Sequence, residues 1–111
     1  MNVTIRQLGV ELNSEEREWL RRRLQFALAR WADRIDQVIA YLGDENGPRG
    51  GDDKTCRLLI FLPRTGRLTV HEQGADLRDI VSRAADSLAQ TIDRRLKRQH
   101  RRAHTLRPTW N

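Results

Sequence analysis

Four short segments of the chain carry hydrophobic residues at every second position, as β-strands that bury one face do. In the first segment Val3 and Ile5 fall on the same side and are predicted to face the core. A run with four glycines and a proline, Gly43–Asp53, follows the second segment and is predicted to be a loop. Pro63–Gly66 is predicted to be a tight turn. The predicted strands are Asn2–Leu8, Ile35–Leu42, Thr55–Leu62 and Arg67–Gln73.

Two further segments repeat their hydrophobic residues at helical spacing. The first begins after Asn13, which forms the capping-box pattern with Glu16, and is predicted to run to about Trp31 or Asp33. The second is predicted over Asp76–Arg102, with its first residue as the cap. The apolar stripes are Leu20, Leu24, Ala27, Leu28 and Trp31 in the first helix and Leu77, Val81, Ala84, Leu88 and Ile92 in the second.

The elements follow in the order β-α-β-β-β-α, which predicts an α+β fold with a four-stranded mixed sheet. Because each helix has a single apolar stripe, both are predicted to pack on the same face of the sheet. The first strand–helix–strand unit predicts a parallel pair with a right-handed crossover, and the later strands predict antiparallel hairpins. We expect one domain over residues 1–102 and a short basic tail over residues 103–111.

Positive charge is concentrated at the end of the chain. Residues 1–93 hold 14 Lys+Arg and 15 Asp+Glu, a net charge of −1, whereas residues 94–111 hold seven Lys+Arg and no acid. The whole net charge of +6 therefore lies in the last 18 residues. A strongly basic segment attached to a nearly neutral body indicates a polyanionic partner such as nucleic acid.

The last helix is predicted to separate its charges. Asp79, Asp86 and Asp93 recur every seven residues and are predicted to form an acidic edge. Four arginines are predicted to form a basic rail about 27 Å long on the opposite flank, which would span several phosphates. The alternative is a frayed and solvated basic tail. The rail consists of Arg83, Arg94, Arg98 and Arg101.

One flank of the first helix alternates aromatic and basic residues. At about 100° per residue, Trp19, Arg23, Phe26 and Arg30 fall together on this flank. An arrangement of this kind can stack bases and bind phosphates. The alternative is that the two aromatic rings widen the core face while the two arginines are solvated.

The face of the sheet that the helices leave open is predicted to be apolar at its centre. Its outward positions include Ile39, Tyr41, Leu59 and Phe61. An exposed apolar patch suits a homodimer, a partner protein or stacked RNA bases, and we rank them in that order.

The sequence holds no convincing catalytic or metal-binding set. His71 is isolated, and His100 and His104 lie among arginines that repel cations. The single cysteine, Cys56, lies in an apolar strand without a local base and is predicted to be a buried thiol. The N-terminus shows no signal segment, and no apolar run approaches about 18 residues. We expect a cytoplasmic, non-enzymatic protein without metal, cofactor or membrane partner.

An ordered set of short motifs resembles the bacterial ribosome hibernation promoting factor / ribosome-associated inhibitor A family over about residues 2–102. The first motifs are Glu11-Leu12-Asn13, Arg23-Leu24, Arg30-Trp31 and Ile35-x-x-Val38-x-Ala40-x-Leu42. The later ones are Gly66-x-Leu68-x-Val70 and Asp76-Leu77, followed by Leu88, Ile92 and a basic helix end.

The resemblance implies the β-α-β-β-β-α fold, which is similar in shape to double-stranded RNA-binding domains. It also implies binding to the 16S ribosomal RNA of the small ribosomal subunit, in the channel of messenger and transfer RNAs, and inhibition of translation under stress or in stationary phase. Arg23 and Arg30 match basic positions of the family's first helix, and Arg94 and Arg98 match those of the second. The chain resembles the short form, without the C-terminal dimerisation domain of the long form.

Three positions depart from the family pattern. Phe26 stands where the family usually has lysine, and Ser87 and Gln90 replace lysine and arginine in the usual Lys-Leu-x-Arg-Gln-Leu run. These replacements remove positive charge from the expected RNA face. The alternative to ribosome binding is therefore a protein-interaction or homodimerisation module that uses the open sheet face.

Overall fold

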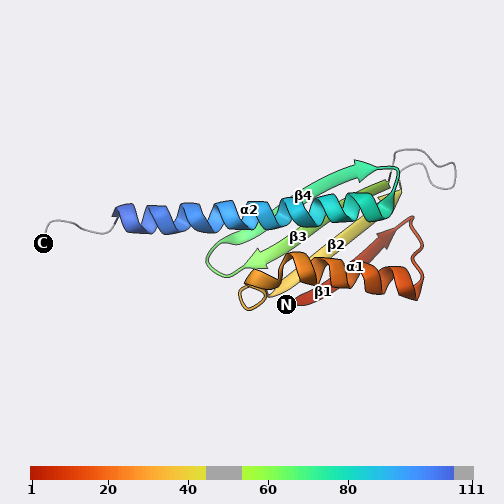
Figure 1. Ribbon diagram of the computed structural model, residues 1–111, viewed down its shortest axis with the longest axis horizontal. Coiled ribbons are helices and arrows are strands. Elements are labelled where there is room, and N and C mark those ends of the chain that lie inside the picture. Colours follow the sequence, from red (N-terminus) through yellow and green to blue (C-terminus); the bar gives the residue numbers. More distant parts are fainter. Residues whose placement is uncertain (45–53, 107–111) are drawn as a thin grey trace, which may run out of the picture.

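The computed structural model describes residues 1–44 and 54–106, with side chains up to residue 100. Its elements are β1 (Asn2–Leu8), α1 (Ser14–Ala27), the 3-10 turn η1 (Ala29–Trp31), β2 (Gln37–Asp44), β3 (Lys54–Leu62), β4 (Gly66–Gly74) and α2 (Leu77–Leu106) (Figure 1). The predicted order β-α-β-β-β-α and the α+β class are confirmed. Residues 45–53, most of the predicted glycine-rich loop, lie outside the described part of the chain.

The four strands form one sheet in the order β1-β2-β3-β4. β1 and β2 are parallel and are connected through α1, whereas β2–β3 and β3–β4 are antiparallel. The predicted mixed sheet is therefore confirmed. β2 begins at Gln37 rather than at Ile35, because the Ile35 amide donates to the Trp31 carbonyl at 3.0 Å and so belongs to the turn after η1.

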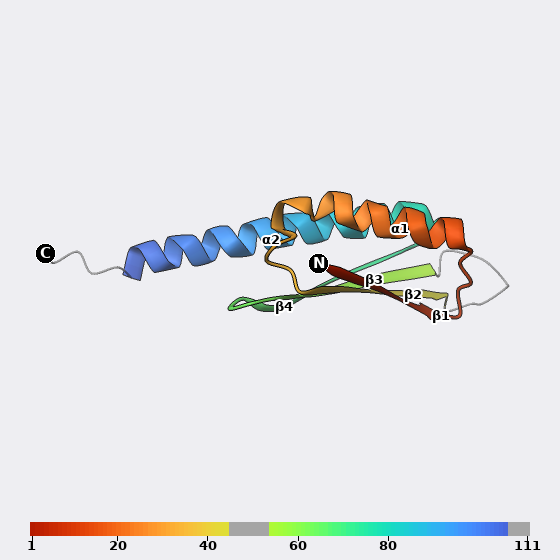
Figure 2. The ribbon, with the colours of Figure 1, turned by 90° about the horizontal axis from the view of Figure 1, so that it is seen from below.

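Both helices lie on the same face of the sheet, which gives the molecule two layers (Figure 2). Alternate side chains of β2 and β3, among them Ala40, Leu58 and Ile60, are fully buried between the layers. Leu24 of α1 and Leu88 of α2 are also fully buried in this core cluster. The predicted packing of two helices on one face is confirmed, and the described residues leave the other face open.

α1 begins with the predicted capping box. The Asn13 side chain accepts a hydrogen bond from the Glu16 amide at 2.7 Å, and the Asn13 amide donates to the Glu16 carboxylate at 3.1 Å. The α-helix ends at Ala27, earlier than predicted, because η1 completes the segment with tighter 3-10 hydrogen bonds. Trp31 still reaches the core from η1.

α2 is the longest element, with 30 residues, and spans about 45 Å. The Asp76 carboxylate accepts a hydrogen bond from the Arg78 amide at 3.0 Å, as expected for the predicted cap. Ile92 is the last fully buried residue among the side chains that the structure describes, and the helix continues to Leu106, beyond its predicted end at Arg102. The basic segment therefore leaves the core as the continuation of a buried helix and extends past the sheet (Figure 1).

The described residues show neither a reactive thiol nor a metal cluster. Cys56 is buried and free, as predicted, and its burial, with a smaller effect of the nearby Glu72 carboxylate, raises the pKa of the thiol to about 12. The thiol is therefore protonated and inert at neutral pH. Within the described part of the chain no helix is long and apolar enough to cross a bilayer. No three His, Cys, Asp or Glu side chains of that part are grouped to hold a metal ion.

Candidate nucleic-acid interface

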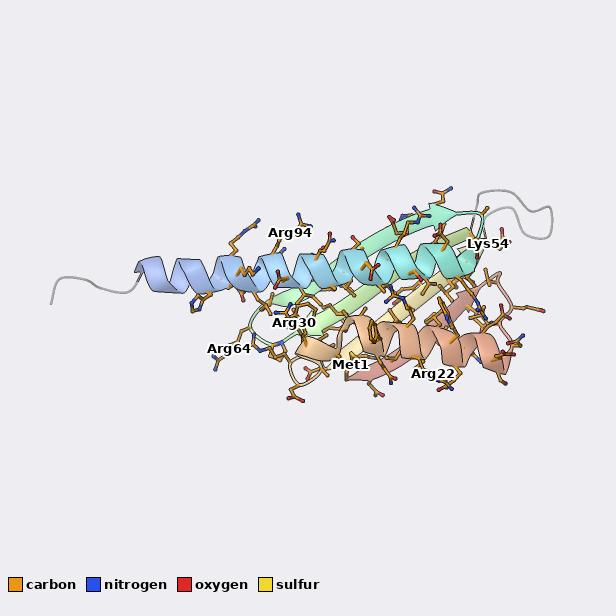
Figure 3. All side chains as sticks on the ribbon, viewed as in Figure 1. Met1, Arg22, Arg30, Lys54, Arg64 and Arg94 are labelled. Atoms are coloured by element: carbon orange, nitrogen blue, oxygen red, sulfur yellow. The ribbon has the colours of Figure 1, made fainter. Side chains whose placement is uncertain are left out.

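The end of α2 presents arginines that no carboxylate of the described residues neutralises. Arg94 and Arg98 are four residues apart, share one face of the helix and are exposed. Neither makes an ion pair or a side-chain hydrogen bond within the described part of the chain. Arg94 projects from the side of α2 that faces away from α1 (Figure 3). Two unpaired guanidinium groups on a rigid helix suit the phosphates of a nucleic acid.

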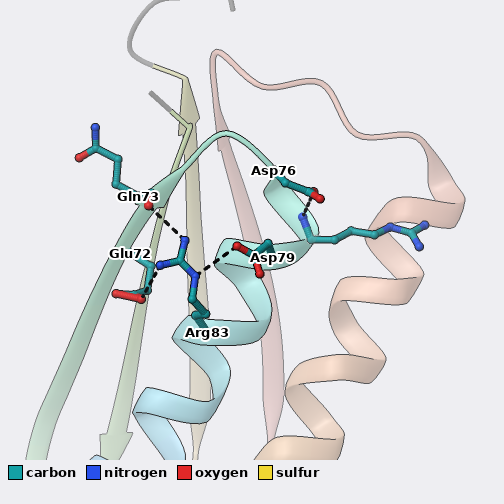
Figure 4. A network of polar contacts seen from close by, with 6 residues as sticks. Glu72, Gln73, Asp76, Asp79 and Arg83 are labelled. Carbon is teal, nitrogen blue, oxygen red and sulfur yellow. Dashed lines mark hydrogen bonds and ion pairs between the residues drawn. The ribbon is translucent and has the colours of Figure 1, made fainter. Parts of the chain in front are cut away.

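Arg83, at the other end of the predicted rail, is held by the protein itself (Figure 4). Its guanidinium lies 3.4 Å from Asp79 and 3.5 Å from Glu72, and it donates to the Gln73 carbonyl at 3.2 Å. The prediction of an acidic edge opposite a basic flank is wrong here, because Arg83 and Asp79 are four residues apart and lie on neighbouring positions of one face. The side chain of Arg101, the last residue of the rail, lies outside the described residues.

The acidic edge of α2 instead faces α1. Arg23 pairs with Asp86 at 2.8 Å, and Arg30 lies 3.9 Å from Asp93. The two arginines are seven positions apart, and so are the two aspartates. Because α1 and α2 run side by side in the same direction (Figure 1), each arginine meets one aspartate. The Arg23 side chain is 22% exposed and that of Arg30 74%. Arg23 therefore joins the helices, whereas Arg30 keeps an open side for a ligand.

We expect the Arg23–Asp86 pair to contribute a coupling free energy of about 0.5–1 kcal/mol to folding, since its arginine is mostly shielded from solvent. The measurement is a double-mutant cycle of Arg23→Ala and Asp86→Ala by urea unfolding. The control is the more exposed Arg22–Glu18 pair of α1, at 3.2 Å, for which we expect about 0.3 kcal/mol. A coupling no larger than that of the control would show that the ion pair does not hold the helices together.

A cleft of about 570 Å³ lies between η1 and the end of α2. It is lined by the apolar side chains of Trp31 and Leu96 and by the basic side chains of Arg30, Arg34, Lys97 and His100. The Arg30 guanidinium lies 5.1 Å from the centroid of the Trp31 ring, over its face. Basic groups around an apolar floor can bind a phosphate while the rest of a nucleotide packs against the apolar surface.

Asp93 is shared by two of the cations that line this cleft, Arg30 and Lys97. Lys97 hydrogen-bonds the Asp93 carboxylate at 2.9 Å and thereby lowers its pKa. Desolvation acts in the opposite direction, and the charges of Lys97 and Arg30 lower the pKa further. The carboxylate is therefore ionised at neutral pH, and two cations to one carboxylate leave this group with a net positive charge.

Sequence reasoning did not single out Arg34, Lys97 or His100 as site residues. Arg34 lies four residues after Arg30, and Lys97 lies three residues before His100. Residues at these spacings share one face of a helix, so the sequence did indicate that each pair could lie together. A second cleft of about 430 Å³ adjoins the first, because Arg34 and Leu96 line both. It also reaches Arg64 of the β3–β4 turn, which lies at the same end of the long axis as Arg30 and Arg94 (Figure 3).

The two aromatic residues on the flank of α1 differ in their surroundings. Trp19 packs against the core, with the Arg78 guanidinium 5.1 Å from its ring centroid. Phe26 is 81% exposed. The interpretation of a widened core face therefore holds for Trp19 and fails for Phe26, whose ring is open to a stacking partner.

The four apolar residues predicted on the open sheet face lie together there. Ile39 and Leu59 are cross-strand partners, and Tyr41 and Phe61 flank them on either side. Phe61 is 38% exposed, and the other three are half-buried. This patch lies on the face opposite to α2 and is therefore separate from the basic end of that helix (Figure 2).

No protein-family model matches the sequence, and no curated protein sequence matches it. The backbone, however, matches the crystal structure of the Thermus thermophilus Protein Y N-terminal domain with a TM-score of 0.69 and 22% identity, over 85% of this chain and 98% of that one. The chain has the Protein Y fold. A ribosomal subunit interface protein from Coxiella burnetii matches with a TM-score of 0.70 and 15% identity, over 85% of this chain and 96% of that one. The Protein Y fold confirms the fold that the sequence motifs implied.

Proposed function

We propose that this chain belongs to the ribosome hibernation promoting factor / ribosome-associated inhibitor A family and acts in the cytoplasm. It binds the small ribosomal subunit through 16S ribosomal RNA and inhibits translation under stress. The observation that carries the proposal is that Arg94 and Arg98, on the projecting helix of a Protein Y fold, have no carboxylate partner among the described residues. The name of one of the two similar structures, a ribosomal subunit interface protein, supports an association with the ribosome.

The mechanism needs no covalent step. Arg94 and Arg98 neutralise RNA phosphates on one side of α2, and Arg30 and Lys97 do so from the cleft on the other side. The first half of α2 is buried against the sheet, so the bound arginines keep a fixed position relative to the body of the domain. The two-layer body then occupies the channel that messenger and transfer RNAs use.

The six predicted RNA-binding arginines have different places in this mechanism. Arg94, Arg98 and Arg30 offer charge to RNA, and Arg101 extends the same helix. Arg23 and Arg83 are neutralised mainly by the protein's own carboxylates, so we assign them to the packing of α2.

The proposal predicts binding to the small subunit that weakens steeply with salt. Arg94, Arg98 and the Arg30–Lys97–Asp93 group, which has one net positive charge, should together release about three counterions, so log K should fall with log salt at a slope of about −2.5. Affinity would then drop about 30-fold between about 50 and 200 mM salt. The measurement is sedimentation of the full chain with separated small and large subunits, with bulk RNA as competitor. Equal binding to both subunits, or full competition by bulk RNA, would contradict a specific small-subunit site.

A further inference from the structure

The open face of the sheet carries positive charge and, among the described residues, no carboxylate. The strand register places Arg6, Arg57 and Arg67 on this face, and all three are exposed. None of them forms an ion pair within the described part of the chain. Glu72 of β4 lies on the helical side, where it pairs with Arg83. Because residues 1–93 hold more acids than bases, a face without acids is a clear departure from the rest of the body.

Each aromatic ring of this face has an arginine as a direct cross-strand neighbour. Tyr41 of β2 lies between Arg6 of β1 and Arg57 of β3 in the register, and the Arg57 guanidinium is 5.0 Å from the centroid of the Tyr41 ring. Phe61 of β3 pairs with Arg67 of β4 in the same way. Neighbouring side chains on one face of a sheet are about 5 Å apart at Cβ. The open face therefore presents an aromatic ring beside an arginine at two places.

We propose that this face binds an unpaired segment of RNA, with bases stacked on Tyr41 and Phe61 and phosphates beside Arg6, Arg57 and Arg67. Single-stranded RNA can bind a sheet of this kind because its bases stack on the aromatic rings while arginines beside the rings bind its phosphates. The bases of a duplex are stacked on one another, so their faces are not available to the rings. A second copy of this chain fits less well. A two-fold dimer through this face would bring the arginines of both copies together without a described carboxylate to neutralise them.

This site is separate from the α2 interface, and its test does not need the ribosome. The full chain is titrated into a fluorescein-labelled single-stranded RNA of about 12 nucleotides at about 50 mM salt, and anisotropy is followed. We expect Tyr41→Ala with Phe61→Ala to weaken binding about tenfold or more. Arg57→Ala with Arg67→Ala removes only exposed side chains and keeps the test valid if the aromatic variant does not fold. We expect it to weaken binding about tenfold.

The matched control is Arg94→Ala with Arg98→Ala, which removes the same charge from α2. The proposal requires the sheet-face arginine variant to lose more affinity for single-stranded RNA than this control loses. Its affinity for an RNA duplex of the same length should equal that of the wild type. An α2 variant that loses as much or more would overturn it. Light scattering gives a second test. If the wild type is a dimer, the Arg57 and Arg67 variant stays a dimer and the aromatic variant becomes a monomer, the face binds a second copy and the proposal is overturned.

Discussion

Replacing Arg94 and Arg98 together by glutamate is expected to abolish co-sedimentation of the chain with small ribosomal subunits. Both side chains are exposed and unpaired within the described residues, so the substitutions should leave the fold intact. Each phosphate contact becomes a repulsion, and we expect affinity to fall about 100-fold or more, equivalent to about 2.7 kcal/mol. The milder pair Arg94→Gln with Arg98→Gln should lose about tenfold and reduce the salt slope by about two.

A matched control separates local contact from total charge. Arg17→Glu with Arg22→Glu makes the same change in net charge on exposed positions of α1, whose Arg22 lies far along the molecule from the end of α2 (Figure 3). We expect this variant to lose less than about threefold in affinity, through long-range attraction alone. Equal losses in the two variants would mean that net charge, and not the end of α2, determines binding. Wild-type binding by the Arg94 and Arg98 variant would exclude α2 as the contact.

Truncating Leu88 to alanine is expected to have the largest effect on the free energy of unfolding. Leu88 is fully buried where α2 packs on the sheet, and removal of such a side chain leaves a cavity as well as losing apolar burial. We expect a loss of about 3–4 kcal/mol, which is a large part of the roughly 5–15 kcal/mol of a domain this size. Urea unfolding followed by circular dichroism measures it, and the melting temperature should fall by roughly 15 °C.

Phe26→Ala is the control for this prediction, because it removes a larger side chain that is 81% exposed. We expect it to change the free energy of unfolding by less than about 0.5 kcal/mol. A small effect of Leu88→Ala would mean that α2 is not anchored by this core. The fixed position of the basic segment relative to the body would then lose its physical basis.

The strands, the helices and their packing could be predicted because burial alone determines them. In β3, Leu58 and Ile60 lie on the side that the helices cover, whereas Leu59 and Phe61 share the other side with the exposed Arg57, whose charge indicates the open face. The capping box at Asn13 could be predicted for a similar reason, since it involves only residues within one turn.

The charge partners across the two helices could not be predicted in this way. Asp86 pairs with Arg23, which is 63 residues away in the sequence, and only the packed structure brings them together. The cleft lined by Arg34 and Lys97 likewise depends on how η1 meets α2. The Arg83–Asp79 contact, by contrast, is local, and its spacing of four residues could have predicted it, although the two residues were expected on opposite flanks of the helix.

RNA is proposed to lie directly against the basic end of α2, and a tethered cleavage probe tests this contact. Gln90 is exposed and lies one turn before Arg94 on the same side of α2. A Gln90→Cys variant can carry an iron–EDTA group on its new thiol, since burial and a pKa of about 12 keep Cys56 unreactive. A Glu15→Cys variant carries the same group at the start of α1 as the control.

Hydroxyl radicals formed at the probe cut RNA strands in its immediate surroundings. With the chain bound to ribosomes, we predict a few strong cuts in the small-subunit RNA from position 90, weak cuts from position 15, and loss of the strong cuts after Arg94→Glu with Arg98→Glu. Cuts from position 90 that do not exceed those from position 15, or that spread evenly over the RNA of both subunits, would contradict the account.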